Sequence, residues 1–337
     1  MLTLTLLTES QIPWASLDAY HDRTVFQTQQ WLQFIAEIHQ ATPAVIEIRE
    51  QRDLVGYFTG LVIRICGVKI LGSSFPGWIT PYIGFNLIPG FPRRELLDQV
   101  AEFAFDQLGC WHIEISDRAL QPKDAQGTKF QLDFLESYET DLTRAEDDIL
   151  ASMNKERRRC IRRAAEAGVI VESAADERFA DEYHDQLKEV FAKQKLPPSY
   201  GVEMVRALVR IMGPTGRVLF LRARDPADGR CIATGIYPGM NRIAEFWGNA
   251  SYRSGLSLHP NEALHWYAMR YWRARGLQVF DWGGGGDYKQ KYGPIHRPIV
   301  WLRRSRCKAL ARVRDRARDL FKLKQRILYR MRGRPGS

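Results

Sequence analysis

The feature that most constrains the fold is a unit of helix, glycine and buried strand that occurs twice. In the first copy, apolar residues with a helical period over 92–108 stop at Gly109 and precede the strand 110–116. The second copy begins at Pro260, ends at Gly276 and continues into the strand 277–282. Four pairs share one displacement of 167: Gly109 and Gly276, Leu97 and Leu264, Ala101 and Ala268, and Glu114 and Asp281. The constant displacement predicts two similar α/β halves.

The rest of the pattern repeats in the same order. Helical periodicity precedes strand-like segments in both halves: a helix over 26–39 with strands 44–48, 54–63 and 68–71, then helices 182–194 and 202–212 with strands 218–223, 231–237 and 242–247. Thr143 and Glu146 have the spacing of a capping box and predict a joining helix that ends near Gly168. We predict mixed central sheets flanked by helices, with a first half at 1–142, a second half at 143–302 and a basic helix or tail at 303–337.

Charge is concentrated at the carboxyl end of the chain. The 337 residues have a formal net charge of +10, but residues 303–337 contain 14 basic residues against Asp315 and Asp319, so the rest is nearly neutral. Residues 303–334 predict an amphipathic basic helix that packs on the body, docks on an anionic membrane surface or binds RNA. With 45% apolar residues the chain is not disordered. Its five scattered cysteines, and the lack of a signal peptide or membrane span in the sequence, predict a cytoplasmic protein, peripheral on the membrane if the tail binds lipid.

The most informative motif follows the second buried strand. Four consecutive glycines, Gly283–Gly286, let the backbone approach a ligand closely or simply leave the strand sharply. Their spacing fits neither GxGxxG nor GxxxxGK[ST], which excludes the dinucleotide-binding and P-loop sites. The sequence Tyr-Lys-x-x-Tyr-Gly comes next, at 288–293.

This segment resembles the Phe-Lys-x-x-Phe-Gly signature of Fem-type peptidyl and aminoacyl transferases, which consist of two acetyltransferase-like (GNAT) halves. Three further segments fit the family in the same order: 26–31, 154–164 and the strand end Phe280-Asp281. The resemblance covers roughly residues 24–302. It implies a tandem GNAT-like fold and an N-acyltransferase.

The resemblance also implies a reaction, in which an amine attacks an acyl carbonyl carried by coenzyme A or by a tRNA ester. Lys289, with Tyr288 beside it, would lie at the acyl centre, where a cation stabilises oxyanion charge. Asp281 would orient Lys289 or accept a proton. The alternative for Asp281 is a carboxylate satisfied by backbone N–H groups.

The donor site implied by the GNAT likeness is the loop before Pro260, because the free N–H groups of a helix start favour an anion. Its candidate residues are Tyr252, Arg253, Gly255, Ser257 and Asn261. The loop departs from the usual Q/R-x-x-G-x-G/A pattern, so acyl-CoA and another phosphate-bearing carrier such as aminoacyl-tRNA both stay open.

The resemblance further implies the candidate acceptor residues Trp31, Arg158, Arg162 and Tyr292, of which the arginines lie in a dense basic helix over 155–163. That helix either binds the acceptor or is a solvated face. Many Fem enzymes have a lysine soon after the tryptophan matching Trp31, but this chain has none before Lys69, which predicts a different acceptor.

No metal site is expected, because His259 and His265 are six residues apart and point in different directions on a helix. Three functions remain: an acyl-CoA-dependent N-acyltransferase acting on an amine-bearing sugar or cell-envelope precursor, a tRNA-dependent aminoacyltransferase, and a non-catalytic protein that binds a membrane surface.

Overall fold

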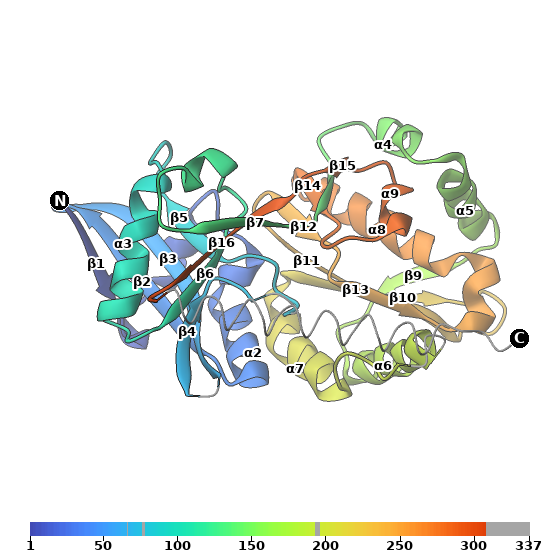
Figure 1. Ribbon diagram of the computed structural model, residues 1–337. Helices are drawn as coiled ribbons and strands as arrows, with labels where there is room; N and C mark the ends of the chain where they lie inside the picture. Colours follow the sequence, from blue (N-terminus) through green and yellow to red (C-terminus); the bar gives the residue numbers. More distant parts are fainter. Residues whose placement is uncertain (66, 76–77, 193–195, 308–337) are drawn as a thin grey trace, which may run out of the picture.

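Two mixed eight-stranded sheets form the framework of the protein (Figure 1). A computed structural model describes residues 1–65, 67–75, 78–192 and 196–307. The first sheet contains, in spatial order, β1 (Leu2–Leu6), β2 (Thr42–Glu50), β3 (Asp53–Ile65), β4 (Val68–Gly72), β6 (His112–Ser116), β16 (Ile299–Ser305) and β7 (Gln131–Leu135), with β5 (Gly84–Leu87) beside β3. The second contains β15 (Ile295–His296), β8 (Tyr138–Asp141), β14 (Val279–Asp281), β12 (Ile243–Glu245), β11 (Cys231–Met240), β10 (Val218–Arg224) and β9 (Ile170–Ser173), with β13 (Gly248–Ser251) beside β11.

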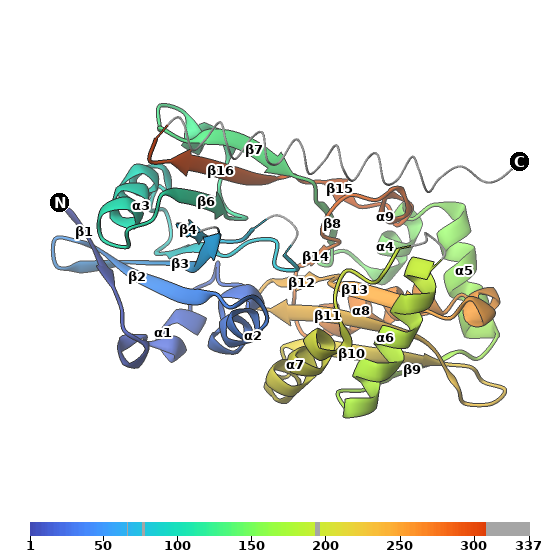
Figure 2. The same ribbon diagram turned by 60° about the horizontal axis from the view of Figure 1, so that its bottom comes forward.

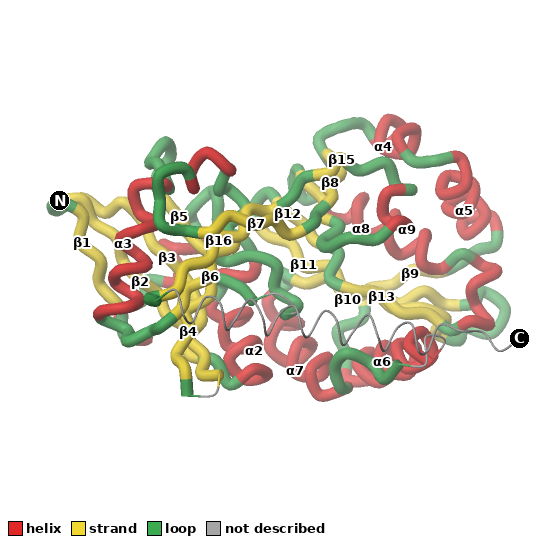
Figure 3. The backbone as a smooth tube through the Cα atoms, viewed as in Figure 1, coloured by secondary structure: helices red, strands yellow, loops and turns green. Residues whose placement is uncertain are grey.

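Helices cover both sheets, as the periodicity predicts (Figure 3). They are α1 (Trp14–Asp18), α2 (Gln29–His39), α3 (Arg94–Asp106), α4 (Glu146–Ser152), α5 (Lys155–Glu166), α6 (Glu177–Ala192), α7 (Val202–Met212), α8 (Pro260–Ala274) and α9 (Asp287–Gln290). Strand β10 shows that the two faces of the second sheet pack against different helices. Its residues Val218 and Phe220 belong to the core under α6 and α7, whereas Leu219 and Leu221 belong to the core under α8. Burying each such side chain contributes about 1.5–3 kcal/mol.

The two halves share one strand pattern. In the first half, β4 and β5 both pair with β3, and β4 also pairs in parallel with β6. In the second half, β12 and β13 both pair with β11, and β12 also pairs in parallel with β14. The helices α3 and α8 precede the parallel strands β6 and β14. The predicted duplication is therefore visible in the pairing, but the break in the divided strand spans 73–83 in the first half and only 246–247 in the second.

Each half gives one strand to the other. Strand β8 follows β7 in sequence but pairs with β14 and β15 of the second sheet, whereas β16 pairs with β6 and β7 of the first. The two connections cross side by side, because Arg297 N donates to Ser137 O at 2.9 Å. The predicted boundaries at 142 and 302 therefore do not separate the sheets. Residues 303–305 are strand rather than tail, and 308–337 lie outside the described residues.

The segment that joins the halves also differs from the prediction. Thr143 does not cap a helix, because its hydroxyl and N–H both donate to Asp141 Oδ1. Helix α4 begins at Glu146 and ends at Ser152, and α5 starts separately with Asn154 Oδ1 accepting from Arg157 N at 2.8 Å. The Asp141 carboxylate thus takes the hydroxyl that was predicted to cap the helix. The predicted single helix is two helices, because the backbone is extended at Met153 and Asn154 and Asn154 caps the second.

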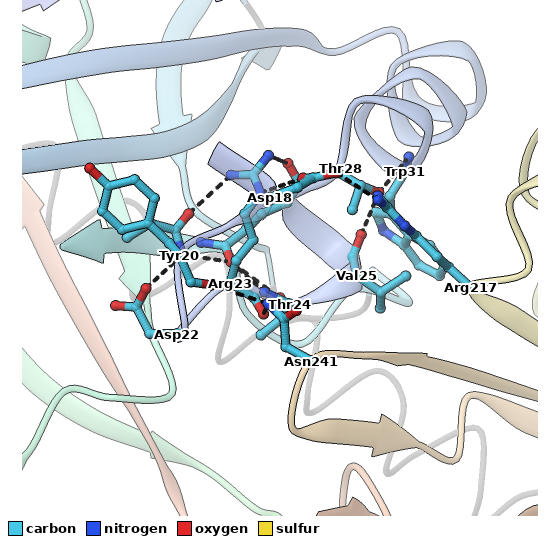
Figure 4. Close-up of polar contacts among 12 residues, drawn as sticks. Asp18, Tyr20, Asp22, Arg23, Thr24, Val25, Thr28, Trp31, Arg217 and Asn241 are labelled. Carbon is cyan, nitrogen blue, oxygen red and sulfur yellow. Dashed lines mark hydrogen bonds and ion pairs between the residues drawn. The ribbon is translucent and has the colours of Figure 1, made fainter. Parts of the chain in front are cut away.

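The halves dock through a shared core and a polar bridge. Helices α2 and α7 pack side by side, and their apolar faces belong to one cluster (Figures 1 and 2). Figure 4 shows the bridge, in which Asn241 Nδ2 donates to the carbonyl oxygens of Tyr20 and Arg23, and Arg217 pairs with Asp18 at 2.7 Å. The two halves thus form one continuous structure.

Candidate active site

The candidate site lies where β12 and β14 part. Their parallel pairing ends at Glu245 and Asp281, after which Phe246 N donates to Asp281 O and the chain continues beside β11 as β13. The glycine-rich loop 283–286 follows β14, and the 3₁₀ helix η5 (Arg253–Leu258) follows β13. Strand β14 runs in the same direction as β12 and as its continuation β13. Both loops therefore leave the sheet at its carboxyl edge, where α/β proteins bind ligands.

Asp281 is fully held in place. It is buried, and its Oδ1 accepts from Ser137 Oγ and from Gly283 N, the latter at 2.8 Å. Its Oδ2 accepts from Tyr82 OH at 3.1 Å. Tyr82 belongs to the first half and Ser137 to the crossing connection. The carboxylate is therefore satisfied by three donors, only one of which is a backbone N–H.

Glu245 is a site residue that the sequence analysis missed. Its register opposite Asp281 puts the two carboxyl groups on one face of the sheet, and only 5% of Glu245 is exposed. Its Oε2 has no hydrogen-bond partner within the described residues. Burial raises its pKa well above the ordinary value, and Asp281 adds to the rise, against the opposing charges of Lys289 and Arg118. A buried glutamate in the apolar segment 243–247 was the available signal.

Lys289 anchors the glycine-rich loop. Its buried Nζ donates to the carbonyl oxygens of Trp282, Gly283 and Gly284 at 2.5, 2.9 and 3.2 Å. An ammonium has three donors, so all of them are used. Burial lowers the pKa of Lys289, and the charges of Glu245 and Asp281 oppose that shift. The structure thus brings Lys289 and Asp281 together, as predicted, and adds Glu245.

Tyr288 lies on the exposed side of the same short helix. Nearly half of the side chain, 47%, is exposed, yet desolvation of its hydroxyl raises the pKa to about 12. Tyr288 therefore stays a neutral phenol at physiological pH.

The predicted donor loop is closely packed on β11, and its first helical N–H is bound by a carboxylate of the same chain. Tyr252 N donates to Ile232 O at 3.0 Å, and a Cβ at Gly255 would lie 2.7 Å from Ile232 Cβ, so only glycine fits there. Arg253 N donates to the carboxylate of Glu189 at 2.8 Å. A carboxylate of this chain thus occupies the first N–H of η5.

The start of α8 is tied to β13. Asn261 accepts from Asn249 Nδ2 at 2.9 Å and donates to Ser251 Oγ at 3.1 Å, so its amide is used internally. Ser257 is exposed on η5. Tyr252 and Ser254 line a cavity of about 410 Å³ with Arg178, Arg224 and Arg230.

Two predicted acceptor residues are buried. Trp31 has no exposed surface, and its Nε1 donates to Thr80 Oγ1 at 3.0 Å. Tyr292 is 2% exposed and packs on Trp282 with ring centroids 4.5 Å apart. Side chains so enclosed stabilise the fold and do not reach a substrate, so the prediction of substrate contact is wrong for both in this structure.

The predicted basic acceptor residues lie elsewhere. Helix α5 packs on α8 at the end of the second half that is farthest from the first half (Figure 1). Arg158 donates to the carbonyl oxygens of Ala151 and Met153 and so caps the end of α4. Arg162 is mostly exposed and pairs with Glu166 at 3.4 Å. Neither arginine is brought to the cleft between the halves.

No group of three or more metal-ligating side chains occurs in the described part of the chain. Glu262 bonds to Arg157, and His265 Nδ1 lies 2.9 Å from Tyr237 OH. Burial lowers the pKa of His265 to about 3, which keeps the ring neutral. Within residues 1–65, 67–75, 78–192 and 196–307, we find no helix with the length and apolar character needed to cross a membrane.

The strands β12 and β14, which part at Glu245 and Asp281, and the loop and helix α8 that follow β13 lie within a segment that matches a known domain. Residues 151–292 match the family model described as an acetyltransferase (GNAT) domain. Residues 151–292 therefore form a GNAT-type acetyltransferase domain. The domain spans α5 to α9 and contains Glu245, Asp281 and Lys289.

Solved structures share the fold of this protein over most of its length. The structure entitled "Crystal structure of FemX" is 11% identical with a TM-score of 0.71, covering 88% of this chain and 96% of that one. A tandem GNAT protein from the clavulanic acid biosynthesis pathway is 13% identical with a TM-score of 0.52, covering 90% and 98%. L-PGS from Bacillus licheniformis is 12% identical with a TM-score of 0.51, covering 93% and 99%. No curated protein sequence matches. These likenesses confirm the tandem GNAT-like fold.

Proposed function

We propose that this acyltransferase forms an amide by transferring an acyl group from acyl-CoA to an amine on a sugar or cell-envelope precursor. The observation that carries the proposal is the buried Oε2 of Glu245, which has no hydrogen-bond partner among the described residues. It lies at the parting of β12 and β14, next to the loop that Lys289 anchors. FemX and L-PGS share the fold, which supports an envelope substrate. The proposed location is cytoplasmic, where acyl-CoA is available.

Glu245 is the proposed proton acceptor. The amine nitrogen bonds to the thioester carbonyl carbon and loses a proton to Glu245 Oε2. The C–S bond then breaks, and the leaving thiolate takes up a proton. A raised pKa suits this role, because general bases work best with a pKa near the operating pH. Asp281 already accepts three hydrogen bonds, which makes it a positioning residue.

The glycine-rich loop is the proposed oxyanion site. In a trans peptide the C=O and the following N–H point in opposite directions. Because Lys289 Nζ binds the carbonyl oxygens of Gly283 and Gly284, the N–H groups of Gly284 and Gly285 point away from it. Neither N–H has a partner within the described residues. Two such donors can stabilise the charge that develops on the carbonyl oxygen.

The test is a transfer assay with a panel of CoA thioesters and amino sugars, in which the amide product is detected by mass spectrometry. We expect Glu245→Gln to lower the rate by at least about 100-fold, while CoA still raises the melting temperature as in the parent. The matched control is Glu172→Gln, which removes a carboxylate on the edge strand β9. Unchanged transfer by the Glu245 variant would contradict the proposal.

The second candidate is a tRNA-dependent aminoacyltransferase, and the contact of Glu189 with Arg253 N favours it. The pyrophosphate of CoA, if bound at the start of η5, must displace the Glu189 carboxylate from Arg253 N. An acyl donor that binds at another place, such as an aminoacyl-tRNA, need not displace it. We expect Glu189→Gln to increase thermal stabilisation by CoA if CoA is the donor. Stabilisation by aminoacyl-tRNA but not by CoA, in parent and variant alike, would establish the second candidate instead.

A further inference from the structure

A cavity of about 400 Å³ opens where the two halves and the crossing connections meet. Tyr82, Asp117 and Arg118 of the first half line it, together with Glu139, Arg242 and Arg297. The residues of the glycine-rich loop, α9 and η5 are not among its lining. It is therefore a second concave surface on the acyltransferase.

Unused arginine donors dominate this cavity. Arg118 binds Glu139 through Nη2 at 2.5 Å, but its Nε is buried without a partner in the described residues. Arg242 donates through Nε to the neutral amide of Gln278 at 2.7 Å. Arg297, largely exposed, reaches Glu139 only at 3.6 Å. Since each guanidinium carries five N–H donors, the donors of Arg242 and Arg297 that make no bond within the described residues are available to a ligand.

The charges do not cancel within the cavity. Asp22 and Asp117 are both held by Arg93, which lies outside the lining, and Arg23 is paired with Asp18, which also lies outside. Two carboxylates held by one guanidinium leave one negative charge, and Glu139 adds a second, against the three positive charges of Arg118, Arg242 and Arg297. The excess is one positive charge in a partly enclosed space.

We infer that this cavity is a binding site for a small ligand with a phosphate or carboxylate group, held by Arg118, Arg242 and Arg297. The planar fork of arginine matches both anions with two parallel hydrogen bonds. The ligand would lie beside Tyr82 and Glu139, each of which adjoins Asp281: Tyr82 by its hydrogen bond and Glu139 by its register in β8.

Titration calorimetry of the full chain with inorganic phosphate, glycerol 3-phosphate and malonate tests this site. We expect millimolar or tighter binding of at least one, weakened at least tenfold by the double variant Arg242→Gln/Arg297→Gln, whose side chains are solvent-accessible. Preference for glycerol 3-phosphate over phosphate would identify an organic phosphate, and preference for malonate a carboxylate.

The matched control is Arg162→Gln/Arg163→Gln, which removes two positive charges from the exposed face of α5. It should bind as the parent does. The site is overturned if none of the three anions binds the parent, or if both double variants bind equally. Since no acyl donor is present, such a failure leaves the proposed reaction untouched.

Discussion

The two halves have the same backbone pairing where their parallel strands part, but the side chains differ at one of the two end positions. In the first half, the parallel pair β4 and β6 ends at Gly72 and Glu114, and Ser73 N then donates to Glu114 O. In the second half, β12 and β14 end at Glu245 and Asp281, and Phe246 N makes the same bond. Gly72 thus stands where the second half has Glu245, whose Oε2 has no partner in the described part of the chain.

The first half has closed this position. A Cβ at Gly72 would lie only 2.4 Å from the ring of Phe75, so the phenylalanine fills the space of a side chain there. The longer break that follows, 73–83, serves the second half: Ile79 O accepts from Trp247 Nε1, and Tyr82 OH donates to Asp281. One copy of the duplicated unit thus supports the proposed site in the other.

The largest predicted effect tests whether the halves can be compared as independent units at all. Fragments 1–142 and 143–337, expressed separately, should both lack a cooperative melting transition. The first lacks β16 and the second lacks β8, which leaves buried strand edges unpaired. As a control, a chain cut in the exposed turn 226–229 between β10 and β11 should still fold when its pieces are co-expressed. A sharp melting transition from fragment 1–142 alone would show that the first half does not need β16 from the second.

The second prediction concerns the carboxylate that only the second half has. Because the folded-state pKa of Glu245 is raised, the native protein binds more protons than the unfolded chain from pH 4.5 up to the raised value. Only the ionised carboxylate of Glu245 can accept a proton, so the transfer rate should rise about tenfold per pH unit below that pKa. Glu245→Gln should remove this rise in the pH profile of kcat. It should also remove an associated loss of stability as pH rises through the same range. A parent profile that is flat over this range would be evidence against Glu245 as the base.

A third prediction concerns the aromatic core of the second half. His265 has a pKa of about 3 when folded and an ordinary value of 6.5 when unfolded, so its stabilising effect is present above pH 6.5 and is lost as pH falls toward 3. Between pH 7.5 and 5 this loss is about 2 kcal/mol. Urea titrations at pH 7.5 and 5 measure the free energy of unfolding of the parent and of His265→Gln. The difference between the two proteins isolates the contribution of His265, because all other titrating groups are the same in both. Equal pH dependence in parent and variant would show that the ring is not held neutral.

The smallest predicted effect tests the support given by the first half. Tyr82→Phe should destabilise the fold by about 1 kcal/mol, because a buried carboxylate loses one of three donors. It should also lower kcat more than it changes KM, since Asp281 is less well positioned. Tyr57→Phe, a change in a small core cluster of the first half, is the comparison and should leave kcat unchanged. Equal effects of the two variants would show that Tyr82 only packs.

The sequence predicted the parts of the site that are local. The glycine-rich run, Lys289 and Asp281 lie within nine residues, so their proximity follows from chain connectivity. Glu245 could not be found in the same way, because its importance depends on its register with a strand more than thirty residues later. Arg158 and Arg162 were predicted to bind the acceptor from the resemblance to the Fem family and from their charge, and neither specifies which way the helix faces in this chain.

What the sequence by itself determined is the duplicated α/β pattern, because hydrophobic period, glycine stops and a constant displacement are properties of neighbouring residues. Only the tertiary structure decided that β8 and β16 change places and that Tyr82 and Ser137 reach Asp281. Only the tertiary structure also decided that Glu245 is buried with an oxygen unpaired in the described chain. These facts depend on strand pairing and desolvation between distant segments, which no local pattern encodes.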